Sequence, residues 1–190
     1  MTKERSLWRP EFLMALELLA EISEAMDRRG LPRPVLVGGG AAEYYSASVL
    51  MTGDIDLASP YQPELEEELR HHGFVKPSGP GTLTRGWVHP RLGLGFEVVA
   101  SVPMGGAVDA AHIVLVDDLV EGASFAIIAV EDLIADRMGQ YASGSAPEML
   151  EQASRLFRLH PNADMGYLDR RIRDETVGDY GLEYLRQEAG

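Results

Sequence analysis

Apolar and polar positions follow a helical period in the first segment of the chain. The apolar residues that share one face there are Phe12, Leu16, Leu19 and Met26. Pro10 suits a first helical turn and Gly30 suits a stop, so the pattern predicts an amphipathic helix over residues 10–29. Its apolar stripe is expected to pack on a sheet.

The next segment changes to short apolar runs separated by glycine. Residues 35–37 form a continuous apolar run that ends in three glycines, and residues 41–50 have a helical composition. Residues 54–57 then alternate polar with apolar, which is the period of a strand with one buried face. The order strand, glycine turn, helix and strand is therefore predicted over residues 35–57.

The remainder of the chain divides into a mixed part and a helical part. The pattern predicts a helix over 63–72, short strands around 82–87, a turn at Asp117 and Asp118, strands over 94–99, 113–116 and 125–130, and helices over 131–141, 147–159, 165–175 and 180–187. We therefore expect an α+β domain over residues 1–130, followed by a small helical bundle over residues 131–190.

The net charge of the chain disfavours some classes of binding partner. The 190 residues carry a formal net charge of −13, and residues 31–150 hold 6 basic and 16 acidic side chains. Tight sequence-independent binding to nucleic acid or to an anionic membrane needs a basic surface, so both are disfavoured and a small charged ligand is favoured.

Cysteine usage and the first residues indicate the compartment. Zero cysteines exclude disulfides, thiolate nucleophiles and cysteine-ligated metal sites, and they agree with a reducing cytoplasm. Glu17, Glu21 and Glu24 interrupt the first thirty residues, so we expect neither a signal peptide nor a membrane span there.

Three acidic residues form the candidate metal site. Asp54 and Asp56 are two apart on a predicted strand, so they share a face with Cα atoms about 6.5–7 Å apart. Glu97, on another predicted strand, would complete a set of oxygen ligands for one or two Mg²⁺ ions. The alternative is that all three are solvated carboxylates.

The glycines upstream supply a candidate anion site. Backbone N–H groups at Gly38, Gly39 and Gly40 would lie at a helix N-terminus, where phosphate groups bind. The alternative is a tight chain reversal that binds no ligand.

These residues resemble a known family. The run from Val37 to Ala42, followed by Thr52-Gly53-Asp54-Ile55-Asp56-Leu57, is similar to the nucleotidyltransferase signature of the DNA polymerase beta superfamily, including small bacterial nucleotidyltransferases and abortive-infection toxins. The resemblance implies a nucleotidyltransferase-like mixed β-sheet flanked by helices. It implies that Gly38, Gly39 and Gly40 contact nucleotide phosphates, and that Asp54, Asp56 and Glu97 are catalytic and bind Mg²⁺ or Mn²⁺.

The resemblance also implies an activity. The enzyme would move a nucleoside monophosphate from an NTP to a hydroxyl of an acceptor, which could be a small molecule, a protein or tRNA. Residues 130–137 are similar to the start of the helix that follows the family's last strand, with Arg137 at a nucleotide-binding position where relatives often have lysine. A toxin–antitoxin role stays open, and an inactive nucleotide-binding or interaction module of the same fold is the alternative.

Other signals are weaker. A Rossmann dinucleotide site would need a small residue where this chain has Glu43. The five histidines lack the spacing of a zinc site. Arg170, Arg171 and Arg173 could reach a triphosphate or form a solvated helix face.

Overall fold

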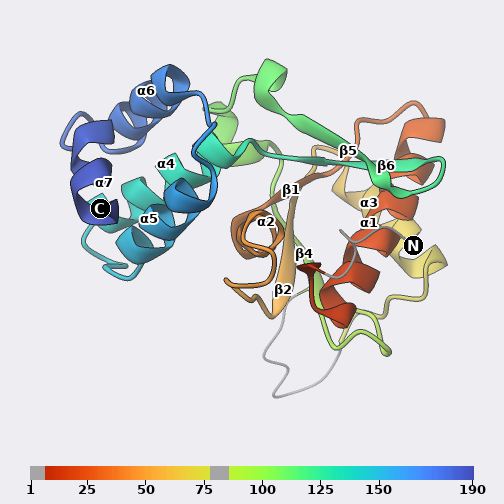
Figure 1. Ribbon diagram of the computed structural model, residues 1–190. Coiled ribbons are helices and arrows are strands. Elements are labelled where there is room, and N and C mark those ends of the chain that lie inside the picture. Colours follow the sequence, from red (N-terminus) through yellow and green to blue (C-terminus); the bar gives the residue numbers. More distant parts are fainter. Residues whose placement is uncertain (1–6, 78–85) are drawn as a thin grey trace. The chain divides into compact units, whose positions relative to one another are not determined.

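The structure is a computed structural model that describes residues 7–77 and 86–190 of the chain. It divides into two compact units, Met1–Ile128 and Ala129–Gly190. The first unit contains a sheet with helices and the second contains helices only, and each is described separately below (Figure 1).

A six-stranded mixed sheet organises the first unit. Its strands are β1 (Val35–Val37), β2 (Asp54–Ala58), β3 (Trp87–Val88), β4 (Gly95–Ala100), β5 (Val114–Val120) and β6 (Ala123–Ile127). They lie in the order β3-β4-β2-β1-β6-β5, with β1 parallel to β6 and β2 parallel to β4, while the other neighbours are antiparallel. Strands β4, β2 and β1 are therefore neighbours in the sheet. Strands β2 and β4 carry the three predicted acids, and β1 ends where the three glycines begin.

In the part of this unit that the structure describes, three α-helices accompany the sheet: α1 (Pro10–Arg28), α2 (Gly38–Tyr45) and α3 (Gln62–His71). The predicted stripe of α1 is fully buried at Phe12, Leu16, Leu19 and Met26. This helix packs on β5 and β6 and lies beside α3 (Figure 1). Gly30, at φ +73°, follows the end of α1 as expected.

Helix α2 differs from its expected bounds. The prediction of a glycine turn followed by a helix over 41–50 is wrong at both ends, because the glycines form the first turn of the helix itself and the helix ends at Tyr45. It ends there because Ala47 and Ser48 take left-handed backbone angles and the Ser48 amide donates back to the Glu43 carbonyl. Residues 46–53 therefore form a loop.

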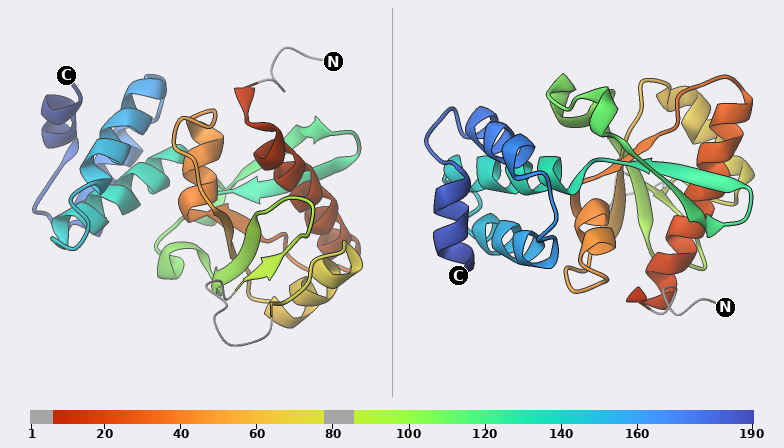
Figure 2. Two further views of the ribbon diagram at one scale, coloured as in Figure 1. Left: turned by 90° about the horizontal axis from the view of Figure 1, so that it is seen from below. Right: turned by 45° about the horizontal axis from the view of Figure 1, so that its top comes forward.

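The second unit is built from four helices: α4 (Val130–Ala142), α5 (Met149–Leu159), α6 (Met165–Glu175) and α7 (Leu182–Ala189). Helix α4 packs on α5 and α6, and α7 packs on α5 and α6. Figure 2 shows these helices gathered together in two further views. Residues 129–190 are all described, and they contain no strand.

The outcome for the fold class follows from these elements. The α+β architecture with a mixed sheet, flanking helices and a C-terminal group of helices is confirmed. The expected turn at Asp117 and Asp118 is wrong, since both lie within the longer β5. Residues 82–85 of the expected strand over 82–87 lie outside the described residues. Among the helices that the structure describes, none is long and apolar enough to cross a membrane.

Candidate functional site

The three predicted acids lie on one face of the sheet. Strand β2 buries Ile55 and Leu57 completely, so Asp54 and Asp56 project from its other side. In the parallel pairing with β4, Asp56 lies directly opposite Glu97. Asp54 is exposed and the other two acids are half-buried, so a ligand can reach all three positions.

The glycines at the start of α2 lie against one of these acids. The Gly39 amide donates a hydrogen bond of 3.3 Å to Asp56 Oδ2. Gly38 has φ +57°, and a Cβ atom added there would come within 2.3 Å of the same oxygen. Only glycine therefore fits at position 38, both for its backbone angle and for the close approach of the carboxylate.

Thr52 connects the second glycine to the first acid. A Cβ atom on Gly39 would lie 2.6 Å from Thr52 Oγ1, so the threonine hydroxyl packs directly on this glycine. The same hydroxyl donates to Asp54 Oδ1 at 3.2 Å. Gly40 has a different role, because its Cβ position faces the apolar side chains of Leu36 and Ile55.

The donor set of the site consists of oxygen atoms. Three carboxylates on adjacent strands are the ligands that Mg²⁺ and Mn²⁺ prefer, so the residues fit such a cation chemically. Within residues 7–77 and 86–190, however, no group of three or more His, Cys, Asp and Glu side chains is gathered closely enough to hold a metal ion. The fold brings the three positions together, and one carboxylate is directed to the start of α2.

The predicted arginines belong to the second unit. Arg137 in α4 is buried, its Nη1 donates to Asp136 Oδ2 at 2.8 Å, and its Nε has no hydrogen-bond partner among the described residues. Arg171 is buried in an ion pair with Asp132 at 2.7 Å. It therefore neither lies on a solvated helix face nor is available to bind a triphosphate, the two alternatives that the sequence left open. Arg170 lies over the Tyr167 ring, and Arg173 pairs with Asp169.

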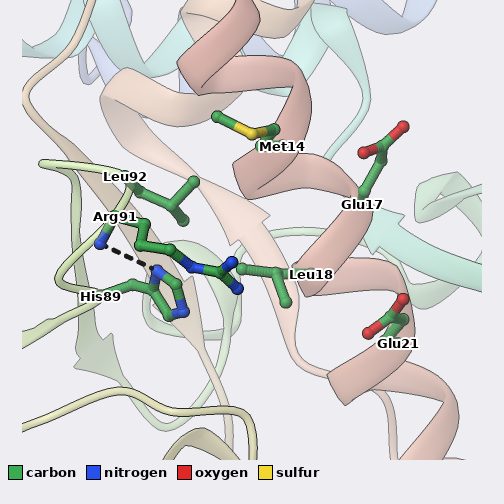
Figure 3. Close-up of a pocket in the computed structure, with 7 residues that line it drawn as sticks. All are labelled: Met14, Glu17, Leu18, Glu21, His89, Arg91 and Leu92. Atoms are coloured by element: carbon green, nitrogen blue, oxygen red, sulfur yellow. Dashed lines mark hydrogen bonds between the residues drawn. The ribbon is translucent and has the colours of Figure 1, made fainter.

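A separate pocket of about 240 Å³ opens between α1 and the segment that follows β3 (Figure 3). Its lining combines apolar and charged side chains: Met14, Glu17, Leu18, Glu21, His89, Arg91 and Leu92. The Arg91 amide donates to Nδ1 of the buried His89 at 3.4 Å. None of the acids or glycines of the candidate site lines this pocket.

Sequence reasoning included Thr52 in the motif without predicting its contacts, and it missed Glu43 and Arg9 as residues of this region. Glu43 entered only as the residue that breaks a Rossmann fingerprint, yet its side chain is fully buried and paired with Arg9 at 2.6 Å. A charged residue inside the apolar run of α2 was the available signal, because a buried carboxylate needs a partner.

Comparisons with known proteins find similar structures but no similar sequences. No protein-family model and no curated protein sequence matches the chain. The chain is similar in structure to the antibiotic-resistance factor ANT(2'')-Ia, with a TM-score of 0.53 and 18% identity, over 92% of this chain and 95% of that one. It is also similar to an antigenic nucleotidyltransferase-like protein from Paracoccidioides brasiliensis, with a TM-score of 0.60 and 15% identity, over 94% of this chain and 92% of that one.

These likenesses cover nearly the whole chain at low sequence identity, and they therefore concern the fold. The chain has a nucleotidyltransferase-like fold. The resemblance seen in the glycine and Asp-x-Asp residues is confirmed at that level.

Proposed function

We propose that this protein is an enzyme that transfers a nucleoside monophosphate from an NTP to a hydroxyl group of an acceptor, with Mg²⁺ or Mn²⁺ as cofactor. The observation that carries the proposal is the meeting of two features at one place. Asp54, Asp56 and Glu97 share a sheet face, and the Gly39 amide at the start of α2 reaches the Asp56 carboxylate. The nucleotidyltransferase-like fold supports the same activity.

The residues have separate roles in this proposal. Asp54, Asp56 and Glu97 would hold the cation, which supplies a positive charge that stabilises the phosphates as they gain negative charge. The amides of Gly38, Gly39 and Gly40 would bind and orient the phosphates of the NTP at the positive end of α2. Arg137 keeps its predicted nucleotide-binding role as part of the proposal.

The reaction balances without a further reagent. The acceptor oxygen forms a bond to the α-phosphorus, the bond between the α-phosphorus and the bridging oxygen breaks, and pyrophosphate leaves. The hydroxyl proton leaves to solvent. The side chains of the site contribute position and charge, which are the main requirements of phosphoryl-type transfer.

The net charge of the chain favours some classes of acceptor over others. A net charge of −13 disfavours long-range capture of RNA and favours a small or cationic acceptor, or a protein. Binding of tRNA below micromolar Kd at physiological salt would contradict this part of the proposal.

A second function, nucleotide binding without transfer, is favoured by one observation. The described residues contain no ready-made group of three metal ligands. A module of this kind would bind NTP at the glycines and leave the chemistry to a partner.

One screen separates the two functions. Each of the four NTPs, labelled on the α-phosphate, is incubated with Mg²⁺ or Mn²⁺ and with tRNA, aminoglycosides or the protein alone. Transfer of label by the parent and not by an Asp54→Asn, Asp56→Asn double variant supports the enzyme. Nucleotide binding with no transfer to any acceptor supports the binding module.

A further inference from the structure

The loop between α2 and β2 has a strained backbone next to the candidate site. Residues 46–53 lead from the end of α2 to Asp54. Two consecutive residues of this loop, Ala47 at φ 51° and Ser48 at φ 62°, occupy the left-handed region that side chains other than glycine avoid. Such a backbone persists only where its surroundings hold it.

Apolar packing does not hold the tip of this loop. Val49 is 55% exposed and Met51 is 72% exposed. The loop shape must therefore depend on the polar contacts at its base.

Glu43 makes those contacts from inside α2. Its side chain is fully buried, and its carboxylate accepts four hydrogen bonds. Two come from Arg9, through Nε at 2.6 Å and Nη2 at 3.0 Å. The other two come from the loop itself, through Ser48 Oγ at 2.9 Å and the Thr52 amide at 2.7 Å.

Arg9 also makes direct hydrogen bonds to the loop. Its Nη2 also donates to the Thr52 carbonyl at 2.5 Å, and its amide donates to Ser48 Oγ at 3.0 Å. The neighbouring Trp8 stacks on Tyr44 and donates its indole N–H to the Tyr44 carbonyl, so this segment is itself fastened to α2. Planar two-pronged donation of this kind is specific to arginine.

Both backbone groups of Thr52 are thus held by one ion pair, in which Glu43 is fully buried and Arg9 is half-buried, and Thr52 Oγ1 donates a hydrogen bond to Asp54 Oδ1. We infer that Glu43, together with Arg9, is a positioning residue that holds Thr52, and through it Asp54, in place for nucleotidyl transfer. This inference rests on the proposed function. It adds two residues to those already proposed to hold the phosphates and the cation.

The first test measures the loop without any ligand. Amide hydrogen exchange is compared in the parent, in Glu43→Gln and in the matched control Glu24→Gln, which weakens a different half-buried ion pair of the same unit, that with Arg33. Glu43→Gln should speed exchange in residues 46–54 by about tenfold, because the loop loses its charged partner. Exchange in β1 and β4, and throughout Glu24→Gln, should stay within twofold of the parent.

The second test measures binding of Mn²⁺ alone to the same proteins by electron paramagnetic resonance. Residues that orient metal ligands typically change affinity by about 10–100-fold, so Glu43→Gln should bind Mn²⁺ at least tenfold more weakly. Arg9→Lys, which keeps the charge and loses the two-pronged donation, should lie between Glu43→Gln and the parent. Glu24→Gln should bind as the parent does.

The outcomes separate the inference from the proposed function. A parent that binds no Mn²⁺ and transfers no nucleotide overturns the proposed function. A parent that binds Mn²⁺, with Glu43→Gln binding it equally well, overturns the positioning role alone, whether or not the loop exchanges faster. If Glu43→Gln fails to fold, Thr52→Val removes only the hydroxyl that contacts Asp54, and unchanged Mn²⁺ binding by that variant overturns the inference.

Discussion

The carboxylate of Asp56 lies against the first turn of α2, where it accepts a hydrogen bond from the Gly39 amide. A negative group is stabilised there because the free N–H groups of a helix N-terminus carry partial positive charge. The proposed phosphate-binding turn and the proposed metal ligand are therefore in direct contact. A substitution in the glycine turn should therefore affect Asp56, and a substitution of Asp56 should affect the turn.

The contact between Gly38 and Asp56 predicts a difference between two glycine variants. Gly30→Ala introduces a side chain at φ +73° into open space, so it should cost only the backbone strain of about 1–2 kcal/mol. Gly38→Ala carries a similar strain at φ +57° and also displaces Asp56, so it should cost at least about 1 kcal/mol more and abolish transfer. Urea unfolding measures both, and equal costs would contradict the close approach.

The metal response of the fold should depend on Asp56. In the parent, Mn²⁺ with a non-hydrolysable NTP should raise the free energy of unfolding by about 2.7 kcal/mol at one hundred times the dissociation constant. Asp56→Asn should lose most of this response, because the amide is a poor ligand and the site has one negative charge fewer to attract the cation. Thermal unfolding with chelator and with Mn²⁺ compares the two proteins. Asp117→Asn, on the exposed part of β5, is the matched control and should respond as the parent does; equal responses in all three proteins would remove Asp56 from the site.

The buried His89 should make the first unit sensitive to pH. Burial, and to a smaller extent the nearby Arg91, lowers the pKa of His89 below its ordinary value of about 6.5. The unfolded chain then binds more protons than the folded one between the lowered pKa and about 6.5, so stability should fall as pH falls through this window. Urea unfolding from pH 7.5 to 5.5 should show a smaller loss for His89→Gln than for the parent. An NMR titration that gives His89 a pKa of 6.5 or above would contradict the argument.

The ion pair between Asp132 and Arg171 should stabilise the helical unit. Asp132 is fully buried and accepts hydrogen bonds from Arg171 and from Tyr167 Oη, so it links α4 to α6. Asp132→Ala should lower the free energy of unfolding by about 3 kcal/mol, because both donors lose a buried acceptor. Glu151→Gln breaks the exposed pair with Arg155 and should cost less than about 1 kcal/mol. Unfolding followed by far-UV circular dichroism measures the free energy of unfolding of both variants. Equal losses would show that the buried pair stabilises the unit no more than the exposed pair does.

Local patterns in the sequence were sufficient for the strand that carries Asp54 and Asp56, although they misplaced both ends of α2. The alternation over residues 54–57 predicts which side chains of β2 are buried, and Ile55 and Leu57 are indeed inaccessible to solvent. That alternation depends only on the two-residue period of a strand, so no distant residue is needed to predict it. The glycines and the two aspartates were likewise sufficient for the resemblance to nucleotidyltransferases.

Contacts between distant residues decided what local patterns left open. Glu97 could have lain on either face of the sheet, and the register of β4 against β2 places it opposite Asp56. Glu43 and Arg9, which both bond to the loop after α2, are 34 residues apart in the sequence. The residues around Arg171 in the sequence are those of a solvated helix face. Arg171 is nevertheless buried, because it forms an ion pair with Asp132 on another helix.

The sequence by itself therefore determined the α+β class, the strand that carries Asp54 and Asp56, and the family resemblance, because each depends on residues close together in the chain. Only the tertiary structure decided the position of Glu97, the contact of Asp56 with Gly39, and the contacts of Glu43 with Arg9 and the loop. The physical reason is that sheet register and buried ion pairs join residues whose separation in sequence carries no local signal.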